Sequence, residues 1–364
     1  MNHVRTRAAL PGFVLAALLI AGCRPDRDPH EIRLGYAPNL THVQALVALA
    51  RGDFENALPP PARLRATPFN AGPAMIEALF AGELDLAYVG PVPAINGFVQ
   101  SAGRALVIVS GSASGGSALV VRKGAGIDDE KGLAARGVAV PQFGGTQDVA
   151  LRTYLADRGL LTSERGGSVR VLAVPNPEAL TLFRQGQLDA AMVPEPWIAR
   201  IVAEAGGRVF LDERALWPGG RFATTVLVAR REFLAAQPET VRNFLEAHVR
   251  VTDWVRDNPD AALALVRKQV AAVLGRSLPE GTVRAGLARV EPLVDPLPDS
   301  IRTNAGNARA LGYLKRPPAL AGLVDLTLLN GVLRGMGREQ VSAGALGPPG
   351  ARRVQAGAGA AASG

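Results

Sequence analysis

Short apolar runs that follow helices and end in proline turns are the recurring pattern of this chain. Residues 84–93 form such a run, which ends at Gly90-Pro91. An apolar run of this length between glycine and proline is typical of a strand covered on both faces. Apolar residues at helical spacing precede it in 73–80. The pattern recurs 104 residues later (82 to 186), because Gly, Leu, Asp, Ala and Val stand at matching positions in 82–89 and 186–193.

This repeat predicts two α/β units, each of which delivers a turn at the carboxyl end of a buried strand. The second copy also follows a helical stretch, and it ends in Pro194-Glu195-Pro196-Trp197. In open α/β sheets, ligands bind outside the carboxyl ends of the strands. Two such edges that face each other form a cleft, so we expect a ligand site between the two units.

The other segments alternate as in a parallel α/β fold. Further strands are predicted at 32–36, 64–68, 105–110, 118–122, 138–141, 169–174 and 209–211, with helices between them. The strand 224–229 carries the chain back to the first unit, after which the pattern is helical as far as 336.

The predicted fold is therefore α/β, with two Rossmann-like lobes, a ligand cleft between them and two crossing strands. Lobe 1 comprises 32–117 and 225–340, and lobe 2 comprises 118–224. The Gly- and Ala-rich segment 341–364 is predicted to be a disordered tail.

The first residues resemble a bacterial lipoprotein signal. A positive segment with Arg5 and Arg7 precedes an apolar run that is too short for an ordinary membrane span. Small residues then lead to Cys23, the only cysteine of the chain. We expect 1–22 to be removed, Cys23 to be lipidated and 23–31 to be a tether. The protein would then lie on the periplasmic or outer side of the cytoplasmic membrane, held by lipid alone. The alternative is a plain secretory signal with an incidental cysteine.

Composition excludes several classes of protein. With one cysteine and four histidines, we expect no disulfide framework, no metal site and no cofactor. The formal charge of +8 reflects a preference for arginine, or it provides a field that attracts anionic solutes. Aromatic residues make up only 5% and are not interleaved with basic runs, so we expect no nucleic-acid binding. Motifs of metalloproteases, serine hydrolases and P-loop enzymes do not occur, and we expect no catalysis.

The turn at 141–148 is the most suggestive binding site. Its glycines, among them Gly145, lead into a helix that begins at Thr146. Free amides at the positive end of a helix bind anions. The hydroxyl of Thr146 and the side chain of Gln147 add neutral donors. The alternative is an ordinary strand-to-helix turn with a good N-cap.

Further candidates lie at other predicted strand ends. Gly90-Pro91 offers a facing turn, or simply a rigid corner. Trp197 is interpreted as a wall of the cleft rather than a core residue, and Glu195 as a partner for a donor or a cationic group of the ligand. His42 either faces the cleft or is a surface histidine. The small residues at 111–117 bring amides close to a ligand or form a hinge.

In these motifs the chain resembles the solute-binding proteins of bacterial ABC importers, in particular the aliphatic sulfonate, nitrate and taurine group. The resemblance runs from about 32 to 337 and rests on six pieces: LGYAPNLTH (34–42), FNAGP (69–73), AYVGP (87–91), SGGSALVV (114–121), GTQDVALR (145–152) and VPEPW (193–197). It implies a type II periplasmic binding protein whose lobes close around the solute. We expect a monomer that delivers a small anionic solute to an ABC permease and its ATPase subunit.

The resemblance also implies roles for individual residues. Neutral donors for an oxyanion would come from Ser114, Ser117, Thr146, Gln147 and the amides of Gly90, Gly115, Gly116 and Gly145. Tyr88 and Trp197 would face the organic part of the solute, and Glu195 would suit an ammonium group such as that of taurine. The expected solute is an aliphatic sulfonate. Nitrate, bicarbonate, taurine, phosphonates and thiamine-precursor pyrimidines remain open, as does a ligand-sensing role.

Overall fold

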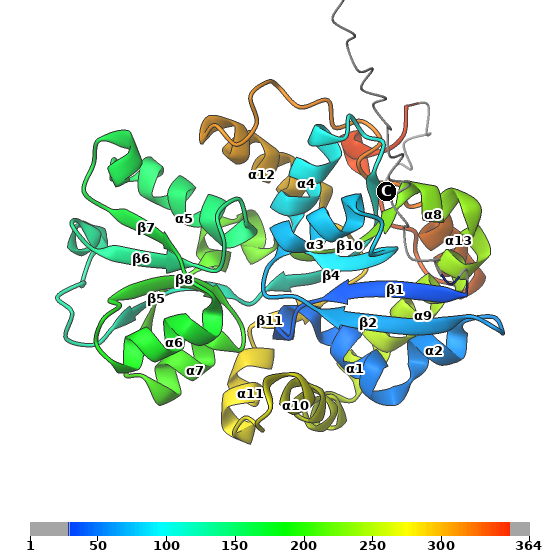
Figure 1. Ribbon diagram of the computed structural model, residues 1–364, viewed down its shortest axis with the longest axis horizontal. Helices are drawn as coiled ribbons and strands as arrows, with labels where there is room; N and C mark the ends of the chain where they lie inside the picture. Colours follow the sequence, from blue (N-terminus) through cyan, green and yellow to red (C-terminus); the bar gives the residue numbers. More distant parts are fainter. Residues whose placement is uncertain (1–27, 29, 350–364) are drawn as a thin grey trace, which may run out of the picture.

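The computed structural model describes residues 28 and 30–349, which form two lobes, each built on one mixed β-sheet with helices against it (Figure 1). This confirms the predicted two-lobed α/β architecture. The predicted signal peptide, Cys23 and most of the tether lie outside the described residues. In Figure 1 the second lobe is green, whereas the first combines blue and cyan segments with later segments from yellow-green to red.

The first lobe contains a six-stranded sheet with the order β11-β4-β10-β3-β1-β2. Its strands are β1 (Glu31–Tyr36), β2 (Arg63–Pro68), β3 (Leu86–Val89), β4 (Leu106–Gly115), β10 (Ala223–Arg230) and β11 (Val290–Pro292). β1 pairs in parallel with β2 and β3, whereas β10 runs antiparallel between β3 and β4. Every residue of β3 and β10 is buried, as expected for strands in a sheet that helices cover on both faces.

The second lobe contains a five-stranded sheet with the order β7-β6-β8-β5-β9. Its strands are β5 (Ser117–Arg122), β6 (Gly137–Val140), β7 (Arg170–Ala173), β8 (Ala190–Pro194) and β9 (Gly207–Asp212). β6 pairs in parallel with β7 and β8, and β5 runs antiparallel between β8 and β9. β3 and β8 come from the two copies of the sequence repeat, and both are interior strands of their sheets.

Helices fill the connections. In the first lobe they are α1 (Val43–Arg51), α2 (Asp53–Ala57), α3 (Gly72–Phe80), α4 (Pro91–Gln100), α8 (Arg231–Ala236), α9 (Pro238–Asp257), α10 (Pro259–Leu274), α11 (Glu280–Leu287), α12 (Pro298–Ala310) and α13 (Thr327–Gly335). In the second they are α5 (Thr146–Asp157), α6 (Asn176–Arg184) and α7 (Trp197–Glu204). Short 3-10 turns are η1 (Leu40–His42), η2 (Glu130–Leu133), η3 (Ser163–Arg165), η4 (Glu213–Leu216), η5 (Pro218–Gly220) and η6 (Gly344–Leu346).

The chain passes between the lobes at two places. β4 continues into β5 through Gly116, and the chain returns between β9 and β10. Gly115 and Gly116 have φ angles of 75° and 71°, which residues with a side chain rarely adopt. A Cβ on Gly116 would also lie 2.6 Å from Cγ2 of Val290. Glycine is therefore needed at this crossing by its backbone conformation and by close packing, and the hinge interpretation of the segment stays a prediction.

β4 corrects one prediction. The sequence predicts a strand at 105–110 and then a glycine- and serine-rich break, whereas β4 continues to Gly115 and pairs with β10 and β11. The small residues serve close packing, because a Cβ on Gly111 would lie 2.1 Å from the carbonyl oxygen of Asp295. Close approach of another backbone, rather than a turn, explains the glycine there.

The C-terminal region corrects a second prediction. The expectation of disorder from 341 is wrong for 341–349, which include η6. The carbonyl oxygen of Leu346 accepts hydrogen bonds from the amides of Gly322 and Val324, each at 3.0 Å, and its side chain is buried. Val341 and Ala343 also pack against the core, and the side chain of Asn330 makes two hydrogen bonds to the backbone of Val341, each at 2.9 Å. Side-chain packing and backbone hydrogen bonds together hold this segment against the core. The rest of the predicted tail lies outside the described residues.

The described residues contain neither a membrane-spanning helix nor a cluster of metal ligands. None of their helices is both long and apolar enough to cross a membrane. They also contain no cluster of three or more His, Cys, Asp or Glu side chains that could hold a metal ion.

Candidate functional site

A small cavity of about 50 Å³ lies between the two lobes. The strands β1, β2 and β3 of the first sheet, and β6 and β8 of the second, end at or beside residues that line it. This is the edge at which ligands bind in open α/β sheets. The cavity therefore stands where the sequence repeat predicts a ligand site.

Several helices begin at this cavity. α3 begins at Gly72, α4 directly after Gly90, α5 at Thr146 and α6 at Asn176, and these four residues line the cavity. In the described structure, none of the four helices has a side-chain cap on its first amides. Prolines replace some of these amides in α3, α4 and α6, but not in α5. The remaining uncapped amides and the positive ends of the helix dipoles favour an anion at this place.

The described residues that line the cavity carry no charge at neutral pH. Their polar side chains are amides, hydroxyls and one imidazole: Asn39, Thr41, His42, Asn70, Gln142, Thr146, Gln147, Asn176, Thr224 and Thr225. Burial lowers the pKa of His42 to about 3, so its ring is neutral. Its Nδ1 accepts a hydrogen bond from the amide of Ala37 at 3.2 Å, which leaves the ring hydrogen on Nε2.

Two buried polar atoms at the cavity have no hydrogen-bond partner among the described residues. They are Oγ1 of Thr146 and Oδ1 of Asn176. Each of these residues is only 4% exposed. Because buried polar groups are nearly always hydrogen-bonded, these two side chains indicate that the cavity receives a solute with hydrogen-bonding groups.

The two lobes touch directly beside the cavity. A Cβ on Gly90 would lie 2.2 Å from Oγ1 of Thr146, which belongs to the other lobe. The φ angle of Gly90 is −65°, which any residue can adopt. The contact, and not the backbone conformation, therefore requires glycine at this position. It also shows that the lobes are closed upon each other.

The structure brings five of the predicted site residues to the cavity: His42, Gly90, Gly145, Thr146 and Gln147. The other eight do not line it: Tyr88, Pro91, Ser114, Gly115, Gly116, Ser117, Glu195 and Trp197. Pro91 is the first residue of α4, directly beside Gly90, and Ser117 begins β5 opposite Pro194.

Tyr88, Ser114 and Gly115 are bonded to residues of the first lobe or of the crossing to it, whereas the carbonyl of Gly116 accepts from the amide of Glu195 at 2.9 Å. The Tyr88 hydroxyl donates to Nδ1 of the buried His248 at 2.7 Å, because Nε2 of that ring donates to the carbonyl of Gly111 at 3.0 Å. The Ser114 hydroxyl oxygen accepts from the amide of Phe222, and the Gly115 carbonyl accepts from the hydroxyl of Thr224.

Glu195 and Trp197 reach the first lobe instead of the cavity. Trp197 donates its indole hydrogen to Oδ1 of Asn39 at 3.0 Å, so it supports a residue that does line the cavity. The fully buried carboxylate of Glu195 lies 3.0 Å from Nη1 of Arg289 and accepts the amide hydrogen of Ala199. Burial raises the pKa of Glu195 to about 7, although Ala199 and Arg289 oppose this shift.

Sequence reasoning missed most of the neutral amides. Asn39 and Asn70 stand in turns directly after predicted strands, and Asn176 begins a predicted helix, so position alone could have suggested them. Thr224 and Thr225 lie inside β10. Nothing in the local sequence distinguishes them from other strand residues.

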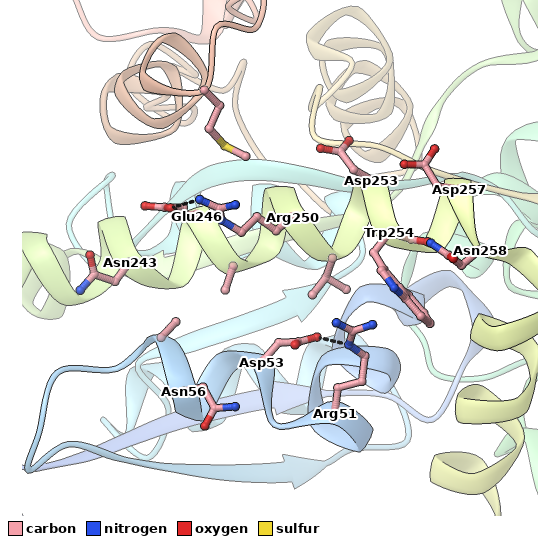
Figure 2. A pocket seen from close by; sticks show the side chains of 14 residues that line it. Arg51, Asp53, Asn56, Asn243, Glu246, Arg250, Asp253, Trp254, Asp257 and Asn258 are labelled. Carbon is pink, nitrogen blue, oxygen red and sulfur yellow. Dashed lines mark hydrogen bonds and ion pairs between the residues drawn. The ribbon is translucent and has the colours of Figure 1, made fainter.

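A larger hollow of about 740 Å³ lies on the first lobe between α2 and α9 (Figure 2). Most charged side chains along it form ion pairs: Arg51 with Asp53 at 2.8 Å, Arg250 with Glu246 at 2.7 Å, and Asp253 with Arg338 at 2.6 Å. Arg51 also covers the ring of Trp254, 4.1 Å from its centroid. None of the described residues that line this hollow has a buried polar atom without a hydrogen-bond partner. The inter-lobe cavity is therefore the candidate site.

Comparison with known proteins shows what the chain is similar to. In Bacillus subtilis (strain 168), the "Putative aliphatic sulfonates-binding protein" is 25% identical over 298 residues, which cover 79% of this chain and 84% of that protein. The "Taurine-binding periplasmic protein" of Escherichia coli (strain K12) is 24% identical over 228 residues, covering 63% and 68%. The alkanesulfonate-binding protein of Xanthomonas axonopodis pv. citri, solved with bound MOPS, shares the fold. Its TM-score is 0.67 at 22% identity, covering 82% of this chain and 99% of that one.

A family model described as the NMT1-like family matches residues 26–271, well over half of the chain. The relatives named above are binding proteins and not enzymes. The chain therefore belongs to the NMT1-like family and is a two-lobed solute-binding protein.

Proposed function

We propose that this chain is the extracytoplasmic solute-binding lipoprotein of an ABC importer. It captures a small organic oxyanion, an aliphatic sulfonate, when the lobes close, and delivers it to a permease. The observation that carries the proposal is the uncharged cavity at the starts of four helices, in which Thr146 and Asn176 keep unsatisfied polar atoms. The relatives that are named as sulfonate-binding proteins support it.

An oxyanion suits this cavity for a physical reason. Three oxygens that share one charge accept several hydrogen bonds at once, and helix amides with neutral hydroxyls and amides supply them without a cation. Thr41, Gln142, Thr146 and Gln147 offer such donors from both lobes. Because the donors are divided between the lobes, the solute stabilises the closed form.

The charge pattern of the cavity disfavours a cationic group on the solute. Among the described residues, no carboxylate lines the cavity, and the carboxylate of Glu195 is already paired with Arg289. An ammonium group buried there would lose its hydration without gaining a counter-ion. We therefore propose that the solute is a simple anion and not a zwitterion such as taurine.

The size of the cavity favours a compact head group. About 50 Å³ holds a few water molecules. A sulfonate group fits such a space when its alkyl chain lies along the boundary between the lobes. The same size favours nitrate as the second candidate, whereas a substituted pyrimidine requires the lobes to open.

Calorimetry on the purified chain tests these points with two isosteric solutes. The two solutes have the same length, but propane-1-sulfonate ends in a methyl group and taurine ends in an ammonium group. We expect the sulfonate to bind at least roughly tenfold more tightly and to raise the melting temperature. If nitrate binds and propane-1-sulfonate does not, nitrate becomes the proposed solute. Binding of neither sulfonate nor nitrate contradicts the oxyanion proposal, and stronger binding of taurine contradicts the charge argument.

Variants locate the site. Replacing Thr146 and Gln147 by Ala together should weaken binding without lowering the melting temperature of the solute-free protein. Thr181→Ala is the matched control, because this threonine lies on α6 of the same lobe and its hydroxyl donates only to the carbonyl of Pro177. Unchanged affinity in the double variant would remove the turn from the site.

The lipid anchor is a separate part of the proposal. Cys23 lies outside the described residues, and its support is the sequence around it. Mass spectrometry of the membrane fraction should show a mature protein that begins with a lipid-modified Cys23. Recovery of Cys23→Ser in the same membrane fraction, at the same amount, contradicts lipid anchoring.

A further inference from the structure

Tyr313 reaches across the boundary between the lobes to Asp148. Tyr313 follows α12 of the first lobe, whereas Asp148 lies in the first turn of α5 in the second lobe. The phenol hydroxyl donates to Oδ2 of Asp148. Arg165 makes a second link between the same regions, because its guanidinium donates to the carbonyl of Ala310 at 3.2 Å. In Figure 1 the segment after α12 and the start of α5 lie on the same side of the molecule.

Asp148 in turn holds the turn that lines the cavity. Its Oδ2 accepts the amide hydrogen of Gly144 at 2.8 Å, and its Oδ1 accepts from Nε of Arg152 at 2.7 Å. Asp148 is fully buried in this arrangement. Gly144 has a φ angle of 72°, which glycine adopts without strain. The hydrogen bond from its amide to Asp148 then holds the turn in this conformation.

The turn fixed in this way supplies the cavity with its second-lobe donors. Gln142, Gly145, Thr146 and Gln147 all line the cavity, and the amide of Gly145 is bonded to the carbonyl of Gln142. Asp148 itself does not line the cavity. It therefore acts through the backbone of the turn and not by contact with a solute.

We propose that Tyr313 is a positioning residue for solute binding, which fixes the turn at 142–147 through Asp148 when the lobes close. This inference rests on the proposed function in one respect, that the cavity receives a solute. Opening the lobes removes the hydroxyl of Tyr313 and exposes Asp148, so the turn loses part of its support at the moment of release. In the closed form, the contact between Tyr313 and Asp148 thus helps to set the positions of the hydrogen-bond donors in the turn at 142–147.

The protonation of Tyr313 is compatible with this role. Burial and the neighbouring Asp148 raise the pKa of Tyr313 to about 12, so the phenol remains a donor at any physiological pH. A hydrogen bond to a buried carboxylate is stronger than one between neutral groups. The Tyr313 ring is only half-buried, so Tyr313→Phe keeps its packing and removes one hydrogen bond.

Two measurements on the full chain test the proposal, with Tyr154→Phe as the matched control. Tyr154 lies on α5 and packs into the core of the second lobe. For Tyr313→Phe we expect the dissociation rate of propane-1-sulfonate, or of nitrate if only nitrate binds, to rise roughly tenfold. The association rate should stay unchanged. The melting temperature of the solute-free protein should fall by a few degrees at most, because the hydrogen bond forms only while the lobes are closed. A merely structural role would lower the melting temperature by more and leave the ratio of the two rates unchanged.

The second measurement needs no solute. Hydrogen exchange of a peptide that contains Gly144 should be faster in Tyr313→Phe than in the wild type, and unchanged in Tyr154→Phe. Equal exchange in all three proteins overturns the proposal, whether or not a solute has been found. If exchange changes as expected but no solute of the panel binds, the proposed function fails while the positioning of the turn stands.

Discussion

Asp85 and Asp189 occupy equivalent places in the two lobes. Each directly precedes the interior strand that comes from one copy of the sequence repeat, β3 or β8. Asp85 binds Arg33 at 3.2 Å and Arg230 at 2.9 Å, and Asp189 binds Arg136 at 2.9 Å and also Arg122. Both carboxylates stand at the amino end of the strand, away from the cavity. Both copies of the repeat therefore place an aspartate between two arginines, in addition to a turn at the edge where ligands bind. We call each aspartate with its two arginines an arginine clamp.

Loss of the first clamp should be costly. Asp85 is fully buried, and although burial raises its pKa, hydrogen bonds from Arg33 and Arg230 lower it overall. Asp85→Asn leaves the largely buried Arg33 without a counter-charge and leaves Arg230 with only the exposed Glu232. We expect a loss of about 3 kcal/mol in the free energy of unfolding. Asp299→Asn removes an exposed partner of Arg302 and should cost less than about 1 kcal/mol. Urea denaturation compares the two, and equal losses contradict the clamp.

Stability should depend on pH through Glu195. Its ordinary pKa of 4.5 rises to about 7 in the closed protein, because burial outweighs Ala199 and Arg289, while Asp212, itself paired with Arg214, adds to the rise. The folded protein therefore holds this proton more tightly than the unfolded chain does. This contribution is complete below pH 4.5 and is lost as the pH rises through 7, with a total on the order of 3 kcal/mol.

Comparison with Glu195→Gln isolates that contribution. His42 and His248, whose pKa values burial lowers, change stability in the opposite direction, and the buried Glu213 changes it in the same direction, but all three are common to both proteins. Between pH 5 and 8, the free energy of unfolding should fall more steeply in the wild type than in the variant. Parallel curves from denaturation at four pH values would show that Glu195 keeps an ordinary pKa.

The fold could be predicted because the sheets are covered on both faces. Buried strands then read as apolar runs, as at 84–89 and 188–193, and the glycine and proline turns mark their ends. Short or edge elements gave no such signal: α2 has five residues and β11 has three, too few for a period to show. The prediction of disorder failed for 341–349 because a few contacts with distant segments, among them the buried Leu346 and the bonds between Val341 and Asn330, hold these residues.

Only part of the candidate site could be predicted from the sequence, and the reason differs from that for the fold. His42, Gly90 and Thr146 follow strand ends, so the topology alone brings them together. The orientation of Glu195 depends on Arg289, which is 94 positions away and comes from the end of α11. No local pattern shows which helix of the C-terminal region packs over that carboxylate. Contacts between distant segments, rather than residue types, decided which candidates face the cavity.

Gly111 offers a test of the correction to β4. A Cβ at this position would lie 2.1 Å from the backbone carbonyl of Asp295, so Gly111→Ala must push β4 and the segment beside it apart. We expect a loss of about 2 kcal/mol or more in the free energy of unfolding. Gly331→Ala in α13 has nothing within 4 Å of the new Cβ and should be neutral or stabilising by about 0.5–1 kcal/mol. If both variants are neutral, the backbone approach at Gly111 is looser than described.

Gly90→Ala should hinder closure of the lobes while leaving the folding of each lobe almost unchanged. The backbone of Gly90 accepts alanine, because its φ and ψ angles are −65° and 151°. The new Cβ would lie 2.2 Å from Oγ1 and 3.2 Å from Cβ of Thr146, and this contact exists only when the lobes are closed. The open form therefore avoids the clash. We expect solute affinity to fall at least roughly tenfold, since the variant must bind in a partly open form, while the melting temperature of the solute-free protein falls by only a few degrees.

Removal of the opposing hydroxyl should restore part of that loss. Thr146→Ala deletes Oγ1, the atom nearest to the new Cβ, so Gly90→Ala should weaken binding less in a Thr146→Ala background than in the wild type. Calorimetry on the four proteins of this double-mutant cycle gives the coupling between the two positions. Additive effects would mean that Gly90 and Thr146 do not meet in the solute-bound protein, and that the bound form is more open than the arrangement described.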